Sequence, residues 1–98
     1  MNIIVESLGN STLLKVEGRL DTVTAPTLDA SINECSEYTE NLVLDLKNLE
    51  YISSAGLRVL LSAQKKMQKI GSMKVKNVCE EVMEIFEITG FADILVIE

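Results

Sequence analysis

Two adjacent serines, Ser53 and Ser54, lie where a short apolar stretch gives way to a helical pattern, and their position could support chemistry. A serine hydroxyl at the start of a helix can accept a hydrogen bond from a backbone N–H of the first turn, which contributes about 1 kcal/mol to stability. Ser53 alone would fill that capping role. The hydroxyl of Ser54 then needs another explanation, as a nucleophile or as an acceptor of phosphate.

The rest of the chain argues against a nucleophilic role for Ser54. The nucleophile elbow of hydrolases has the pattern Gly-x-Ser-x-Gly, in which Gly56 supplies the second glycine but Ile52 replaces the first. The chain contains no histidine, so a Ser-His-Asp triad has no base. A Ser–Lys pair would need Lys65 or Lys66, roughly 15 Å along the same helix at 1.5 Å per residue. We therefore expect a protein that is not an enzyme.

Phosphorylation is the second chemistry that this position suits. A helix start carries unpaired N–H groups and a partial positive charge, which favour a phosphate. A phosphoserine adds about −1.5 to −2 charges at neutral pH. On a binding surface, such a charge could abolish a contact without unfolding the domain.

The helix that follows the serines has the clearest periodicity in the chain. Its apolar stripe steps by four, three, four and three residues through Gly56, Leu60, Ala63, Met67 and Ile70. This spacing predicts an amphipathic helix over residues 54–70. Before it, residues 41–46 form a nearly continuous apolar run, which is typical of a parallel strand covered on both faces. Residues 47–50 are predicted to form a turn.

The remaining segments predict a sheet with further helices. Strands at 3–8 and 12–17 around Gly9 and Asn10 predict a β-hairpin. A helix is expected to begin near Thr24 and Pro26, with Thr24 as its cap. A strand at 73–77, a helix at 80–88 and a last strand at 94–97 follow. The order β-β-α-β-α-β-α-β predicts an α/β fold, a mixed β-sheet covered by amphipathic helices.

Composition limits the classes of function. The chain has 98 residues, 47% hydrophobic and 24% charged, which is the balance of one globular domain. Its net charge of −6 disfavours nucleic acid as a partner. Five of the nine basic residues lie between positions 65 and 76, which leaves a local basic patch as an alternative to an ordinary solvated surface.

Cysteine content and hydropathy bear on location. Cys35 and Cys79 lack metal-binding spacing and are expected to be packed in or near the core. No window is long enough to span a membrane, and the first residues do not resemble a signal peptide. We expect a cytoplasmic protein that needs no metal or other cofactor and does not insert into a membrane.

Two stretches carry a resemblance to a known family. Residues 45–61 read DLKNLEYISSAGLRVLL, and residues 18–25 read GRLDTVTA. Both are similar to the STAS domain family, in particular to bacterial anti-sigma factor antagonists, also called anti-anti-sigma factors. The resemblance extends over essentially the whole chain and implies a single STAS domain at residues 1–98, with the element order given above.

What the resemblance implies is a partner switch that controls transcription. The unmodified protein would bind an anti-sigma factor that is also a serine kinase, and so free the sigma factor. Phosphorylation would release the protein, and a serine phosphatase would reset it. The family pattern places the phosphate on Ser54, with Ser53 as the alternative acceptor, and Ser53 itself stands where the family has an aspartate. The alternative function is a STAS subunit of a transport or signalling complex that is never phosphorylated.

The expected partner-binding residues combine the two stretches. They are Asp21, Thr22, Ser53, Ser54, Gly56, Leu57 and Arg58. Gly56 is expected to allow close approach of the backbone, and Arg58 to supply a charged contact. Leu57 would supply an apolar contact, or would instead pack in the core.

Overall fold

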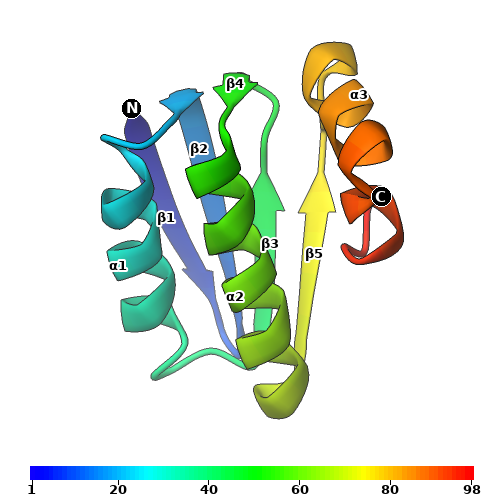
Figure 1. Ribbon diagram of the computed structural model, residues 1–98. Helices are drawn as coiled ribbons and strands as arrows, with labels where there is room; N and C mark the ends of the chain where they lie inside the picture. The colour runs from blue at the N-terminus through cyan, green and yellow to red at the C-terminus, as the bar shows by residue number, and fades with distance from the viewer.

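A computed structural model describes residues 1–98 as a mixed sheet with three α-helices (Figure 1). The elements, in chain order, are β1 (Asn2–Leu8), β2 (Ser11–Leu20), α1 (Ala25–Cys35), β3 (Asn41–Asp45), β4 (Leu49–Ile52), α2 (Ser54–Ile70), β5 (Ser72–Lys76), α3 (Glu80–Thr89) and a 3₁₀ turn at Phe91–Asp93. The predicted fold class is therefore confirmed, with differences in two elements.

The sheet is antiparallel at one edge and parallel elsewhere. Its order is β1-β2-β3-β5, with β4 pairing the far end of β2. β1 and β2 form the predicted hairpin, with Asn2 opposite Glu17 and Leu8 opposite Ser11. β3 runs parallel to both β2 and β5. The carboxyl ends of the parallel strands therefore lie together at one end of the molecule.

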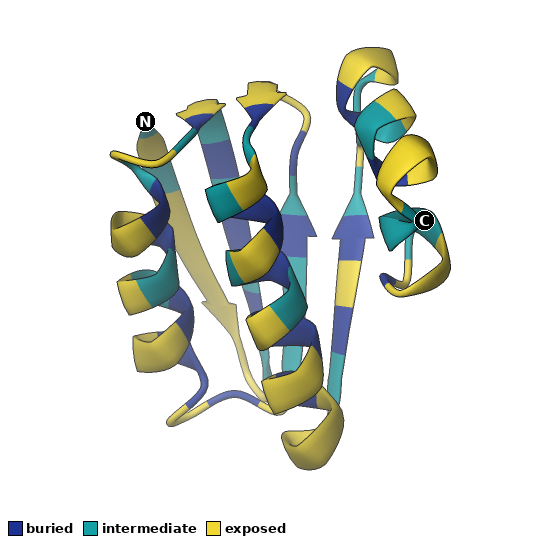
Figure 2. Ribbon diagram, in the orientation of Figure 1, coloured by how far each residue is buried: buried dark blue, intermediate teal, exposed yellow.

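The helices cover one face of the sheet. α1 and α2 lie side by side across it, and α3 lies near β5 (Figure 1). The strand residues that point toward the helices are buried, and on the middle strands these are Leu14, Val16, Leu42, Leu44, Met73 and Val75. The opposite face is half-buried or exposed, and Figure 2 shows the same alternation along the strands. The expectation that residues 41–46 are covered on both faces is wrong. The run looks continuous because Val43, half-buried on the open face, stands between two inward leucines.

The prediction of a turn over residues 47–50 is wrong in part, because β4 already begins at Leu49. The chain turns at Leu46–Asn48 and then pairs in parallel with β2, from Gly18 opposite Leu49 to Leu20 opposite Ile52. Leu49 and Ile52 are buried while the two residues between them are exposed, so the strand lacks the alternation by which strands are recognised. Its pairing with β2 makes it a strand.

The last predicted strand, at 94–97, is also wrong as a full strand. Only Ile97 bridges to Val75 on β5. Two backbone hydrogen bonds hold this segment, from the Val75 N–H to the Val96 carbonyl at 2.8 Å and from the Glu98 N–H to the Val75 carbonyl at 2.9 Å. Ile94 and Leu95 do not form a strand but continue the turn that begins at Phe91, because their N–H groups both donate to the carbonyl of Phe91.

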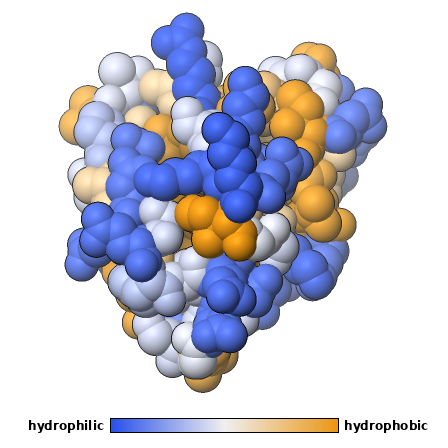
Figure 3. Space-filling view, turned by 90° about the horizontal axis from the view of Figure 1, so that it is seen from below, coloured by the Kyte–Doolittle hydropathy of each residue, from blue (hydrophilic) through white to orange (hydrophobic).

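The lysines between positions 65 and 76 do not form one patch. Lys65, Lys66 and Lys69 are exposed on α2, whereas Lys74 and Lys76 alternate with buried residues of β5 and lie on the open face of the sheet. Figure 3 views the end of the molecule where α2 finishes, which is mostly hydrophilic around a small apolar spot. No helix is both long and apolar enough to span a membrane.

Candidate partner-binding site

Ser53 caps α2, as predicted. Its backbone is extended, with φ −97° and ψ 175°, and its hydroxyl oxygen accepts a hydrogen bond from the Gly56 N–H at 3.4 Å. Its carbonyl oxygen accepts from the Leu57 N–H at 2.9 Å. The side chain is half-buried. The Ser53 hydroxyl is therefore engaged in forming the helix start.

Ser54 is the first residue of α2 and has a different environment. Its side chain is exposed, and its hydroxyl has no hydrogen-bond partner in the protein. No acidic residue lies in the first turn of this helix. A phosphate on Ser54 would therefore meet the positive end of the helix without a carboxylate in the same turn.

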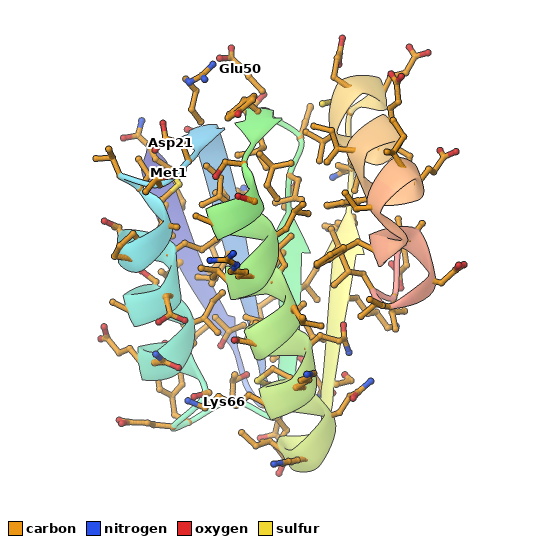
Figure 4. The ribbon with its side chains drawn as sticks, viewed as in Figure 1. Met1, Asp21, Glu50 and Lys66 are labelled. Carbon is orange, nitrogen blue, oxygen red and sulfur yellow. The ribbon has the colours of Figure 1, made fainter.

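The pairing of β2 with β4 brings the two predicted stretches together. Leu20 and Ile52 are opposite each other, and each ends its strand. The Ser53 N–H donates to the Leu20 carbonyl at 2.8 Å, so Asp21 and Ser53 leave the sheet side by side. In Figure 4, Asp21 and Glu50 lie at the end of the sheet where α2 begins. Two segments about thirty residues apart in sequence thus form one surface.

Asp21 organises the loop that precedes α1. One oxygen of its carboxylate accepts hydrogen bonds from the N–H groups of Val23 and Thr24, both at 3.0 Å. The hydrogen bond from Thr24, more than the nearby Arg19 charge, lowers the pKa of Asp21 below its ordinary value of 3.8. Asp21 is therefore ionised at neutral pH and holds the loop in one conformation.

The prediction that the Thr24 hydroxyl caps α1 is wrong. It accepts from the Asp21 N–H at 2.9 Å and donates to the Arg19 carbonyl at 2.8 Å. The backbone of Thr24 is already helical, with φ −92° and ψ −18°, whereas a capping residue is normally extended. Its side chain consequently stabilises the loop beside Ser53 and leaves the first turn of α1 without a side-chain cap.

Gly56 and Leu57 lie beneath this surface. A Cβ atom on Gly56 would lie 2.6 Å from Cγ of Leu20 and 2.9 Å from Cγ1 of Ile52, so the close approach that glycine allows is to the protein's own strands. Leu57 is only 7% exposed and belongs to the core. Core packing is thus its role, and the alternative of an apolar contact with a partner is wrong for this side chain.

Thr22 and Arg58 are exposed, Thr22 in the loop after β2 and Arg58 one turn into α2. Arg58 makes no ion pair, because the two salt bridges of the protein join Lys15 to Glu6 and Lys74 to Glu98. Of the seven predicted residues, five have side chains available at the surface: Asp21, Thr22, Ser53, Ser54 and Arg58.

Arg19 and Tyr51, which lie next to these residues and contact each other, were not identified from the sequence. The guanidinium carbon of Arg19 lies 4.2 Å from the centre of the Tyr51 ring, within the range of a cation–π contact. Arg19 and Tyr51 are opposite each other on β2 and β4, and nearby Val23 is 84% exposed. In the sequence, Arg19 lies two residues before Asp21, and Tyr51 lies two residues before Ser53. This equal spacing indicates that the two side chains are neighbours only once β4 is known to pair with β2.

Comparison with known proteins shows which family the chain resembles. A family model described as "STAS domain" matches residues 2–98. An anti-sigma-B factor antagonist from Bacillus subtilis is 32% identical over 97% of the chain and 88% of its own length. A protein named putative anti-sigma factor antagonist BtrV from Bordetella bronchiseptica is 31% identical over 96% of the chain and 83% of its own length. The crystal structure of an anti-sigma factor antagonist from Mycobacterium paratuberculosis superposes with a TM-score of 0.88 at 26% identity, covering 98% of this chain and 83% of that one.

Proposed function

This chain belongs to the STAS domain family, and we propose that residues 1–98 act as one domain that binds an anti-sigma factor. Both curated relatives described above carry the name of anti-sigma factor antagonist and match nearly the whole chain. These relatives are regulatory proteins. By binding the anti-sigma factor in the cytoplasm, the protein would free a sigma factor for transcription.

The partner surface comprises exposed and half-buried residues near the carboxyl ends of β2 and β4. Asp21, Thr22, Ser53, Ser54 and Arg58 contribute from the two predicted stretches, and Arg19, Val23 and Tyr51 extend the surface beyond them. Tyrosine and arginine are enriched among residues that dominate binding energy at protein interfaces. Gly56 and Leu57 support this surface from below by fixing α2 against the sheet.

Phosphorylation of Ser54 would switch the binding off. The observation that carries this proposal is the different state of the two serines: the Ser53 hydroxyl caps the helix, and the Ser54 hydroxyl is exposed and unbonded. The kinase would be the anti-sigma factor itself, and a serine phosphatase would restore binding. Ser53 is the less suitable acceptor because a phosphate there would displace the cap.

The switch would act through charge at the interface and leave the fold intact. Asp21 and Glu50 already place two carboxylates at this end of the molecule. A phosphate adds about −1.5 to −2 charges, which a partner that closes over Ser54 would have to desolvate. The helix start tolerates the same charges in the free protein, so the modified protein stays folded.

Two experiments test the proposal. The tagged protein is used to capture partners from native lysate, with Ser54→Asp as the comparison, and the captured proteins are identified by mass spectrometry. A kinase-type anti-sigma factor held by the unmodified chain and lost with Ser54→Asp supports the proposal. Capture of a transporter ATPase or a membrane subunit by both forms would favour the alternative of a constitutive STAS subunit.

The second experiment maps the phosphate. The captured kinase and ATP are incubated with the parent protein, Ser53→Ala and Ser54→Ala. Phosphate is expected on the first two and not on the third. Phosphate on Ser53, or none under conditions where the partner binds, would contradict the switch at Ser54.

A further inference from the structure

We propose that Arg58 is the internal partner of the phosphate on Ser54, so that phosphorylation withdraws Arg58 from the partner surface. This inference rests on the proposed modification of Ser54. It adds a second effect to the added negative charge: the protein loses the positive group that it offers to a partner in the unmodified state.

The spacing of the two residues on α2 sets this pair. Ser54 and Arg58 are four residues apart near the start of a 17-residue helix, and such residues are neighbours with Cβ atoms about 5–6 Å apart. Cβ atoms on a helix tilt toward its N-terminus, so the long Arg58 side chain can reach the turn that carries Ser54. Both side chains are exposed, and no other residue of the first two turns of α2 is basic.

Arg58 is free to take this role. It has no hydrogen bond or salt bridge to another side chain, since both ion pairs of the protein involve lysines on other elements. The first turn of α2 holds no acidic residue that would compete with a phosphate. Arg19, at the same end of the molecule, lies instead over the Tyr51 ring.

The chemistry of the two groups matches. A guanidinium presents paired N–H donors that suit a phosphate, and such charge-assisted hydrogen bonds are stronger than neutral ones. An acidic group four residues before a basic one is also the favourable order along a helix. In the unmodified protein, the same guanidinium can meet a carboxylate of the partner. After phosphorylation, that contact competes with an intramolecular one.

The test measures the second ionisation of the phosphate in protein that carries phosphoserine at position 54, introduced during translation. Phosphorus NMR over a pH titration gives the pKa, ordinarily near about 6. Arg58→Gln should raise it by about 0.3 pH units or more, and Arg58→Lys by less. The other charged groups at this end include Arg19, Asp21, Glu50 and the α-amino group of Met1, which lies beside Asp21 (Figure 4).

Arg19→Gln is the matched control, because it removes the same charge from the same end of the molecule but from a side chain held over Tyr51. It should leave the pKa of the phosphate close to that of the parent. Equal shifts for Arg58→Gln and Arg19→Gln, or no shift for either, would overturn the pair. The titration needs neither kinase nor anti-sigma factor, so its outcome is independent of whether a cell phosphorylates Ser54. Thermal unfolding of each variant confirms that the fold is intact.

Discussion

At the scale of single residues, the two serines have separate roles although they are adjacent. The Ser53 hydroxyl accepts from the Gly56 N–H, and the Ser54 hydroxyl faces solvent. Sequence alone assigned the cap to Ser53 because one hydroxyl suffices for it. Sequence could not find the loop around Asp21, because Thr24 has the residue type of a cap but its side chain bonds to the loop.

Replacing each serine by alanine separates these roles. Ser53→Ala should lower the free energy of unfolding by about 0.5–1 kcal/mol through loss of the cap. Ser54→Ala should change it by less than about 0.5 kcal/mol, because the exposed hydroxyl has no partner. Urea unfolding followed by circular dichroism measures both. Equal losses would contradict the division between cap and free hydroxyl.

Asp21 gives stability a dependence on pH. Hydrogen bonding lowers its pKa in the folded protein, so its carboxylate stabilises the fold above the unfolded value and loses this effect as pH falls below 3.8 through the lowered pKa. Asp21→Asn should therefore be less stable than the parent at neutral pH, with a difference that shrinks in acid. Urea unfolding between neutral and acid pH checks this, and a constant difference would contradict it.

At the scale of elements, α2 joins the core to the partner surface. Its apolar stripe was predictable because five apolar residues recur at helical spacing between positions 56 and 70, and the structure has α2 at the predicted 54–70. β4 was not predictable in this way. Its existence depends on β2, where Gly18 has φ 97°, a left-handed conformation that suits glycine, next to the register shift that places Arg19 opposite Tyr51.

Gly56 sets how closely α2 approaches these strands. Gly56→Ala would place Cβ within 2.6 Å of Leu20 and 2.9 Å of Ile52, and such overpacking costs about 1–3 kcal/mol. We expect a net loss of stability even though alanine favours a helix by up to about 1 kcal/mol. Ser62→Ala, at an exposed position of the same helix, is the control and should not destabilise. Unchanged stability of Gly56→Ala in urea unfolding would show that this contact is not close.

Leu57 and Arg58 are adjacent on α2 but differ in burial. Leu57→Ala should cost about 2–4 kcal/mol of stability through a cavity in the core. Arg58→Ala should leave stability within about 0.5 kcal/mol and weaken partner binding about tenfold, or 1.4 kcal/mol. Thermal unfolding and calorimetric titration of the partner measure these effects. If Leu57→Ala kept its stability but bound the partner more weakly, Leu57 would have to contact the partner, which would contradict its assignment to the core.

At the scale of the whole molecule, the site follows from the direction of the strands. In open α/β sheets, binding sites lie beyond the carboxyl ends of parallel strands, and Asp21 and Ser53 lie there, directly after β2 and β4. The order of strands and helices was readable from the sequence in outline. That all helices share one face, and that two distant stretches meet, depends on long-range pairing with no local signal.

The central claim is that unmodified Ser54 permits binding and phosphorylated Ser54 prevents it. Calorimetric titration of the anti-sigma factor identified by capture, against the parent protein and against protein with phosphoserine at position 54, tests this claim directly. We predict that the phosphorylated form binds at least about 100-fold more weakly, a difference of about 2.7 kcal/mol, while its circular dichroism is unchanged. Equal affinity of the two folded forms would contradict the switch.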